Sequence, residues 1–399
     1  MIDCAVVGAG PAGLAASAAL TDRQVEHVVL ERGRAGESWR SQRWDSFRLN
    51  TVGWMNRLLG DQPADAYATG LEVVRRLERL AAACPVRDGA EVTRVEPVSE
   101  GYALRTGAGD VVARTVVVAT GDQNQPKVPA LARRFPARVV HHHTASYRRP
   151  GQLPGGAVLV VGSAQSGCQI AEDLLAGGRR MVLATSPVGR VPFRHRGRDT
   201  VEWQAETGFM DQRPGDLPDP SVMRAAMPIL APGRGLSLPA LARAGVTLAG
   251  RLVAVDGERV AFDDSVAANI AAGDAFAARA RAMVDEVIRR RGLDAPPAEP
   301  DEHDARVDLD PPSSLDLGAR PLVPGPALAE AALLGPPARL PRRRGRRGRR
   351  RPGPPGRLSP PTGTRRGCRS DRGSPPGRPG RGGRRGPGRG PGPGRPGRR

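Results

Sequence analysis

The stretch DCAVVGAGPAG at Asp3–Gly13 decides the fold of this chain. An apolar run at Asp3–Val7 predicts a strand, and three glycines follow it before a predicted helix. Gly8 permits a tight turn, Gly10 lets the backbone approach a diphosphate, and Gly13 lets the helix pack closely on the strand. The start of the helix then offers free N–H groups and a partial positive charge to phosphates. We therefore predict cofactor contacts at Gly8, Gly10, Pro11, Ala12 and Gly13.

A second strand and an acidic residue follow in the order that such a site needs. Glu26–Leu30 is apolar enough for a strand, and Glu31 comes directly after it. A carboxylate at this position can accept hydrogen bonds from a ribose diol. Glu31 and its neighbour Arg32 are therefore candidate cofactor-binding residues.

The segment Val116–Gly121 favours FAD as the first dinucleotide. It is an apolar strand that ends in Ala-Thr-Gly, and in flavoproteins with two dinucleotides such a segment returns the chain to the FAD sheet. A buried strand before a turn explains the valines but not the whole series from Gly8 onward. Thr120 and Gly121 are predicted to line the FAD site.

A second glycine turn predicts a second nucleotide. Val158–Val161 leads into GSAQSG at Gly162–Gly167, where Ala164 replaces the middle glycine with another small residue. No acid ends the next strand, and hydroxyl groups and arginines follow instead. These groups would bind a 2′-phosphate that a carboxylate would repel, which favours NADPH over NADH. A solvated arginine loop is the alternative. The predicted contacts are Gly162, Ser163, Gln165, Ser166, Gly167, Ser186 and Arg190.

The repeated strand–helix pattern predicts the fold class. We expect an α/β protein with two Rossmann-like dinucleotide-binding domains, in which the NADPH domain is inserted into the FAD domain. Single helices are expected at Leu71–Cys84, Gln165–Ala176 and Val266–Arg291. The predicted units are an FAD domain at 1–150, an NADPH domain at 151–295, a linker or return segment at 296–317, and a disordered Arg/Gly/Pro-rich tail at 318–399.

The net charge of +20 belongs to the end of the chain. Residues 341–399 contain 21 arginines and one acid, and the charges of the remaining residues sum to zero. One interpretation is a basic arm that contacts nucleic acid or an anionic surface. The other is a translational frame slip in a GC-rich gene, since such genes read out of frame yield Arg, Pro, Gly and Ala. Nucleic acid is expected as a partner through this arm alone.

Several other classes are disfavoured by the sequence. No apolar run reaches the length of about 18 residues that a membrane-spanning helix needs, and the N-terminus lacks the features of a signal peptide. We therefore expect a cytoplasmic protein. The four cysteines form no C-x-x-C, which argues against a redox dithiol or a zinc site. His141–His143 has no accompanying acid or cysteine, and we predict no metal.

Residues 1–316 resemble the flavin-containing monooxygenases and their bacterial single-chain relatives. Beside the two glycine turns, the resemblance rests on Gly36–Trp39, on Leu49–Thr51 and on His143–Arg148, which is similar to the end of the family fingerprint. The upstream half of that fingerprint, F-x-G, is absent. Tyr147 replaces the tryptophan of Baeyer–Villiger enzymes, which favours heteroatom oxygenation. By resemblance, the catalytic residue is Asn50, and further cofactor contacts are Trp39, His143 and Tyr147.

The resemblance implies an enzyme that uses FAD, NADPH and dioxygen. NADPH would reduce the flavin, and a flavin hydroperoxide would oxygenate a small nucleophilic nitrogen or sulfur substrate. The family's second Ala-Thr-Gly strand near residue 325 and its later acidic turn are missing, so we expect FAD to be held weakly or not at all; without FAD this chain would be inactive. Two alternatives stay open: an NAD(P)H-dependent flavoprotein reductase, and a non-catalytic nucleotide-binding protein with a nucleic-acid-binding tail. The sequence does not predict an oligomeric state.

Overall fold

The computed structural model describes residues 1–60, 63–121, 124–213, 215, 228–301, 303–304 and 306–318. The α-helices are α1 Pro11–Asp22, α2 Glu37–Ser41, α3 Gly70–Ala81, α4 Gln165–Ala176, α5 Thr200–Glu206, α6 Leu238–Arg243 and α7 Val266–Arg291. Short 3₁₀ helices are η1 Gly53–Met55, η2 Arg57–Leu59, η3 Ala130–Arg134, η4 Pro150–Gln152 and η5 Phe209–Asp211. The predicted tail and the expected position of a second Ala-Thr-Gly strand lie outside the described residues, apart from Gly318.

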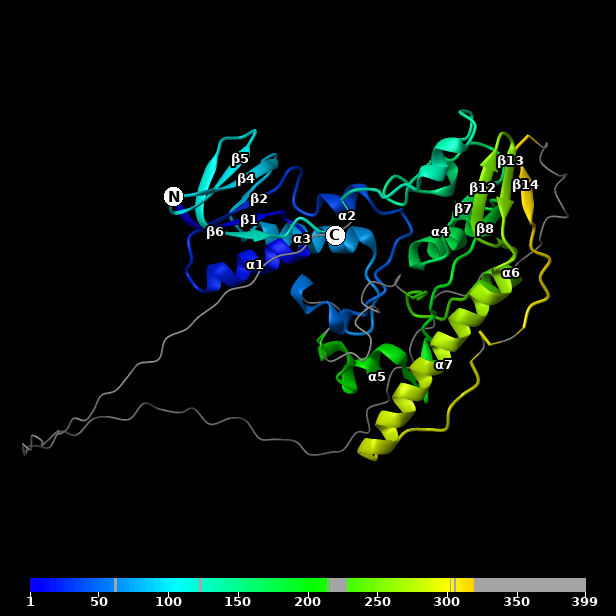
Figure 1. The fold of residues 1–399 in the computed structure, drawn as a ribbon. Helices are drawn as coiled ribbons and strands as arrows, with labels where there is room; N and C mark the ends of the chain where they lie inside the picture. The colour runs from blue at the N-terminus through cyan, green and yellow to red at the C-terminus, as the bar shows by residue number, and fades with distance from the viewer. Residues whose placement is uncertain are drawn as a thin grey trace, which may run out of the picture. The chain divides into compact units, whose positions relative to one another are not determined.

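The first half of the chain forms a six-stranded sheet in the order β3-β2-β1-β6-β5-β4. β1 pairs in parallel with β2 and β6, while β4, β5 and the start of β6 form an antiparallel meander. Helices α1 and α3 pack along this sheet and on each other (Figure 1). The strands are β1 Ile2–Val7, β2 His27–Leu30, β3 Val86–Arg87, β4 Val92–Val98, β5 Gly101–Thr106 and β6 Val111–Val118.

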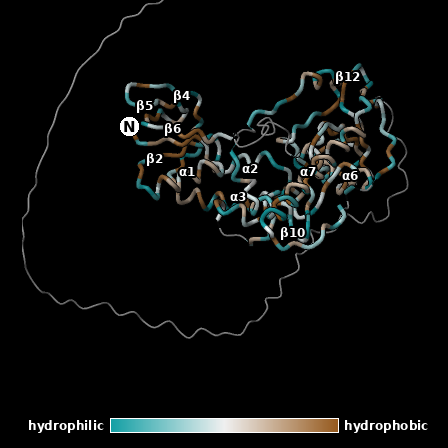
Figure 2. The backbone as a smooth tube through the Cα atoms, turned by 60° about the horizontal axis from the view of Figure 1, so that its bottom comes forward, coloured by the Kyte–Doolittle hydropathy of each residue, from teal (hydrophilic) through white to brown (hydrophobic). Residues whose placement is uncertain are grey.

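Local sequence explains the elements of this half. Both faces of β1 are covered, and its central residues Ala5 and Val6 are fully buried, as expected of a parallel strand. Hydrophobic stretches gather along these strands (Figure 2). Helix α3 begins with a capping box, in which Thr69 and Glu72 bond each other's backbone N–H. Its apolar stripe is buried against the sheet and α1 through Val73 and Leu77.

The second half restarts the strand–helix pattern. A parallel sheet has the order β11-β8-β7, and a second, antiparallel sheet has the order β12-β13-β14. Trp44 and Tyr147 join the core of this half beside residues of α4 and β8. The strands are β7 Val158–Val161, β8 Met181–Ala184, β11 Thr247–Ala249, β12 Leu252–Asp256, β13 Arg259–Phe262 and β14 Ser314–Asp316, with a small hairpin of β9 Arg194–His195 and β10 Arg198–Asp199.

The predicted linker at 296–317 contains structure that the sequence did not indicate. Strand β14 pairs antiparallel with β13, with Leu315 opposite Val260. Upstream of it, Asp301 and His303 are buried against the second half of the molecule. Strand β14, Asp301 and His303 are therefore packed onto the second half of the molecule.

None of the helices in the described ranges combines the length and the apolarity that a bilayer crossing requires.

Candidate functional site

The first glycine turn lies between β1 and α1, and its three glycines serve different purposes. Gly8 has φ +105°, and a Cβ there would lie 2.5 Å from the carbonyl oxygen of Ala119. A Cβ on Gly13 would lie 1.8 Å from the carbonyl oxygen of Gly8. Gly10 has no atom within 4 Å of a Cβ position. The outer glycines are thus required by packing, whereas Gly10 leaves an uncovered stretch of backbone that a ligand can approach.

Glu31 is bonded directly to this turn. Its Oε2 accepts a hydrogen bond from the Ala9 N–H at 2.8 Å, and its Oε1 accepts one from the Gly33 N–H at 2.9 Å. The residue is only 9% exposed. A carboxylate has about four lone-pair positions, so two remain for a ribose diol. The sequence predicted the acid at this position but not its bonds to the turn.

The Ala-Thr-Gly segment lies at the same edge of the sheet. The Ala119 N–H donates to the Val7 carbonyl at 2.9 Å, which continues the pairing of β6 with β1. Asn124 donates to the Thr120 carbonyl and accepts from Arg32 at 3.3 Å. The structure therefore brings the glycine turn, Glu31, Arg32, Thr120 and Gly121 to one edge.

The second glycine turn, between β7 and α4, repeats this geometry. Gly162 has φ +103° and no atom within 4 Å of a Cβ position, and a Cβ on Gly167 would lie 1.9 Å from the Gly162 carbonyl oxygen. Ser163 Oγ accepts from the Ser186 N–H at 3.0 Å and donates to the Ser186 carbonyl at 3.2 Å. Ser163 and Ser186, which were predicted from separate segments, are thereby hydrogen-bonded to each other beside the turn.

Both helices that follow the turns begin in a way that suits an anion. Gly10 caps α1 and Ala164 caps α4, and neither supplies a side-chain acceptor to the first turn. Neither first turn contains an acidic residue. The first-turn N–H groups, including those of Gln165 and Ser166, have no acceptor within the helix and carry the positive end of its dipole. These two turns fit the diphosphates of two dinucleotides.

Trp39 lies in α2, and Asn50 lies in the segment between α2 and α3. Asn50 Oδ1 accepts a hydrogen bond from Gln169 Nε2, on α4, at 2.7 Å. Trp39 packs edge-on against Phe47 with ring centroids 5.9 Å apart, and the Arg43 guanidinium lies 5.0 Å from the Trp39 ring. Asn50 therefore connects the first half of the chain to the helix of the second glycine turn.

His143 and Tyr147 have structural contacts where the two halves meet. Tyr147 is 3% exposed, and its hydroxyl donates to Asp173 Oδ2, on α4, at 2.6 Å. Burial and the Asp173 carboxylate raise the pKa of the Tyr147 phenol above its usual range. His143 Nδ1 accepts from the Ala145 N–H at 3.2 Å. The contacts of Tyr147 hold this segment against α4.

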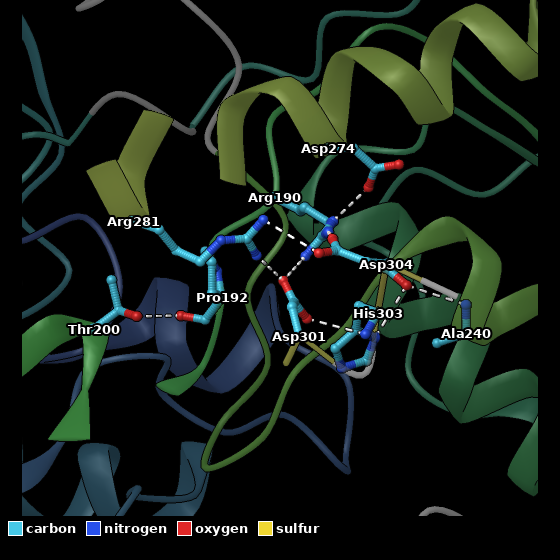
Figure 3. A network of polar contacts seen from close by, with 10 residues as sticks. Arg190, Pro192, Thr200, Ala240, Asp274, Arg281, Asp301, His303 and Asp304 are labelled. Atoms are coloured by element: carbon cyan, nitrogen blue, oxygen red, sulfur yellow. Dashed lines mark hydrogen bonds and ion pairs between the residues drawn. The ribbon is translucent and has the colours of Figure 1, made fainter. Parts of the chain in front are cut away.

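Arg190, predicted to contact the 2′-phosphate, lies in a network of ion pairs. Its side chain is 3% exposed and donates to Asp274 at 2.8 Å, to Asp301 at 2.6 Å and to Asp304 (Figure 3). Because three carboxylates already engage the guanidinium, it is not a free cation for a phosphate. Two of these partners lie more than a hundred residues away in the sequence, so no local pattern indicates them.

The neighbouring arginines are also engaged by acids. Arg194 bonds Asp199 at 3.1 Å and Arg196 bonds Asp285 at 2.6 Å. The described residues contain no group of three His, Cys, Asp or Glu side chains that could hold a metal ion.

Two residues of this region had not been predicted, Gln169 and Asp173. They follow Gln165 on α4 at intervals of four residues, which places all three on one face of the helix. Asp173 also accepts a hydrogen bond from Ser46. The signal that would have found them is this spacing of polar residues on a helix whose other face is buried.

Comparison with known proteins agrees with this geometry. Residues 5–190 match the family described as pyridine nucleotide-disulphide oxidoreductase. An uncharacterized CzcO-like oxidoreductase from Geobacillus kaustophilus is 31% identical over 217 residues, which cover 53% of this chain and 62% of that protein. The indole-3-pyruvate monooxygenase YUCCA1 of Oryza sativa subsp. japonica is 34% identical over 184 residues, which cover 44% of this chain and 45% of that protein.

A solved structure shows the same fold. A double mutant of the flavin monooxygenase from Stenotrophomonas maltophilia superposes with a TM-score of 0.50 at 22% identity, covering 66% of this chain and 74% of that one. The chain spans about three fifths of its CzcO-like relative and less than half of the YUCCA1 protein. The chain is thus similar in sequence to a pyridine nucleotide-disulphide oxidoreductase family and to named oxidoreductases and monooxygenases, and it shares the fold of a flavin monooxygenase.

Proposed function

We propose that this chain is an FAD- and NADPH-dependent monooxygenase that oxygenates a small nucleophilic nitrogen or sulfur compound. The observation that carries the proposal is the pair of glycine turns at Gly8–Gly13 and Gly162–Gly167. Gly8 and Gly162 have similar positive φ values, the two turns follow strands of separate sheets, and each turn precedes a helix whose first N–H groups have no side-chain cap. Two such sites suit an enzyme that passes a hydride from one dinucleotide to another.

The residues at the first turn would hold FAD. The amides at the start of α1 would bind its diphosphate beside Gly10, and Glu31 would accept from the ribose. Thr120 and Gly121 lie at the same edge of the sheet and would contact the flavin nucleotide. The bonds of Glu31 to Ala9 and Gly33 hold its carboxylate in place before the ligand arrives.

The residues at the second turn would hold NADPH. Ser163 and Ser186 lie together beside the turn, and Thr185 directly follows β8 without an acidic residue near it in sequence. The preference for NADPH over NADH rests on that missing carboxylate, because Arg190 is occupied by its own acids.

When bound and reduced, FAD supplies the activation of dioxygen. The chain's own task is to hold both nucleotides and to supply polar groups near the reacting atoms. Asn50, with its bond to α4, is the residue we assign to that role. One relative, YUCCA1, is named as a monooxygenase, which supports oxygenation as the reaction type.

A reductase without oxygenation is the second candidate, favoured by the description of the matching family. The dithiol form of that reaction finds little support among the described residues. Cys4, Cys84 and Cys168 are free thiols. Burial raises the pKa of the Cys168 thiol, and Glu172 adds to the shift, so its thiolate is disfavoured.

One experiment separates these functions. The full chain is supplied with FAD and NADPH, and NADPH consumption, oxygen uptake and oxygenated product are followed with a panel of amines and sulfides. Product in proportion to NADPH supports the monooxygenase. NADPH consumption with an artificial acceptor, but without oxygen incorporation, would show a reductase, and no consumption at all would leave a nucleotide-binding protein.

A further inference from the structure

We propose that Gln169 is a positioning residue that sets the orientation of the Asn50 amide, so that its Nδ2 group is the one left to donate to a bound cofactor. The inference rests on the proposed function and adds a residue to it. It starts from a chain of two hydrogen bonds, one of which ends on a backbone carbonyl.

The Leu230 carbonyl determines the orientation of the Gln169 side-chain amide. Gln169 Nε2 lies 3.1 Å from the carbonyl oxygen of Leu230 and 2.7 Å from Asn50 Oδ1. A backbone carbonyl can only accept, so the group of Gln169 that faces it must be the NH₂ group. Gln169 therefore presents a donor to both neighbours.

The orientation of the Gln169 amide in turn determines that of the Asn50 amide. Because Gln169 presents a donor, Asn50 must turn its oxygen toward α4. The two N–H groups of Asn50 Nδ2 then point away from this bond, and within the described part of the chain no acceptor contacts them. The side chain is half-buried, so a bound molecule can still reach it. An amide held in this way donates to a ligand without first having to reorient.

The position of Gln169 on α4 connects Asn50 to the second nucleotide site. Gln165 lies in the first turn of α4, next to the predicted diphosphate site, and Gln169 lies one turn further on the same face, about 6 Å along the axis. Asp173, a further turn along, holds Ser46 and Tyr147. The segment with Ser46 and Asn50 is thus attached to the nucleotide-binding helix at two successive turns.

Two substitutions should impair the same donor by different routes. Asn50→Asp keeps the oxygen that Gln169 bonds but removes the Nδ2 donor. Gln169→Glu keeps the size of the side chain but removes its donor, so Asn50 turns its NH₂ toward α4 and its oxygen toward the ligand. With FAD supplied, both variants should lower kcat for NADPH oxidation by about tenfold or more while KM for NADPH changes by less than about threefold.

A matched control and a cofactor-free measurement complete the test. Gln152 also donates through Nε2 to a backbone carbonyl, that of Ser146 at 3.1 Å, so Gln152→Glu makes the same chemical change away from Asn50 and should keep kcat within about twofold of the parent. Without cofactors, Gln169→Met should lower Tm by about 2–4 °C in the parent and by clearly less in an Asn50→Leu background, where only the bond to the Leu230 carbonyl is left to lose.

The outcomes are distinct. A Gln169→Glu variant with normal kcat beside an impaired Asn50→Asp variant would overturn the proposal, as would additive Tm changes. A parent chain that does not oxidise NADPH would contradict the proposed function instead, and the thermal cycle still decides the pairing of Asn50 with Gln169.

Discussion

The three glycines of the first turn are needed for two different reasons. Gly8 and Gly13 are required because neighbouring backbone leaves no room for a Cβ, whereas Gly10 faces open space. Its φ of −83° is one that any residue can adopt. The reason for a glycine at position 10 is therefore the ligand and not the fold.

This distinction predicts opposite results for two alanine substitutions. Gly10→Ala should leave Tm unchanged or slightly higher, since alanine reduces the entropy of the unfolded chain, but should weaken FAD binding by about tenfold or more. Gly13→Ala should lower Tm, because its Cβ would overlap the Gly8 carbonyl. Calorimetry and fluorescence titration with FAD measure both quantities. Normal FAD affinity in Gly10→Ala would contradict the assigned diphosphate site.

The ion pairs of Arg190 predict a change in stability on substitution. Removing one partner of a buried ion pair costs about 3–5 kcal/mol, because the remaining charges are left without a partner. Arg190→Met should therefore lower the free energy of unfolding by about that amount, while the ratio of NADPH to NADH affinity stays the same. Denaturant unfolding and coenzyme titration test this. A selective loss of NADPH affinity in a stable variant would restore Arg190 as a 2′-phosphate ligand.

The sequence indicated where turns and strand ends lie better than it indicated which side chains pair with each other. It located Glu31, Ser163 and Asn50, because short-range order along the chain determines strand ends and turns. It did not indicate that Arg190 pairs with Asp301 and Asp304, because these acids lie far along the chain. Such long-range pairing has no periodic signal in a single sequence.

Among the elements, the long and periodic ones were predicted best. The bounds expected for α4 and α7 agree with the structure, because glycine turns or polar residues mark where these helices begin and end. Strand β14 was missed, since Ser314–Asp316 is short and follows a proline-rich segment. Its pairing with β13 is a tertiary contact that no local pattern indicates.

Helix α4 is the element that joins the two halves of the site. The Tyr147 hydroxyl and the Asp173 carboxylate form a part-buried bond on it. Tyr147→Phe should lower the free energy of unfolding by about 1.5–3 kcal/mol, the usual worth of a hydrogen bond to a charged group. Chemical denaturation measures the change, with Tyr102→Phe on the exposed part of β5 as the control. Equal stability of the two variants would show that the bond is not formed.

The ion-pair network of Arg190 and Arg281 joins α7 to Asp301 and Asp304 and predicts a pH dependence. Burial alone would raise the pKa of Asp301, but the hydrogen bond from Arg190 and the nearby charges hold it below its usual value. A lowered pKa in the folded state stabilises the protein above the unfolded pKa of about 3.9, and this stability is lost as the pH falls through the folded value.

Tm should therefore fall steeply as the pH is lowered from 5 through about 3.9 and below. Asp301→Asn should be less stable at neutral pH, and its Tm should depend less on pH over the same range. Thermal unfolding at a series of pH values measures this. Parallel curves for the parent and the variant would contradict the role of Asp301.

The proposed activity of the whole molecule depends on two nucleotides bound at two separate sheets. The turns at Gly8 and Gly162 follow strands of different sheets, while Asn50, Ser46 and Tyr147 tie the first half of the chain to α4. Fold class and both turns could be predicted from sequence, because each is a local pattern. The contacts between the halves could not, since they depend on how separate elements pack.

The most direct test of two communicating nucleotide sites is anaerobic reduction of FAD bound to the full chain, followed through the visible flavin absorbance. NADPH should bleach the band in the parent protein. A Gly162→Val variant should retain FAD but bleach only with dithionite, since its second turn needs the positive φ that valine resists. If NADPH leaves the band of the parent unchanged while dithionite removes it, no hydride passes between the two sites, and the central claim is wrong.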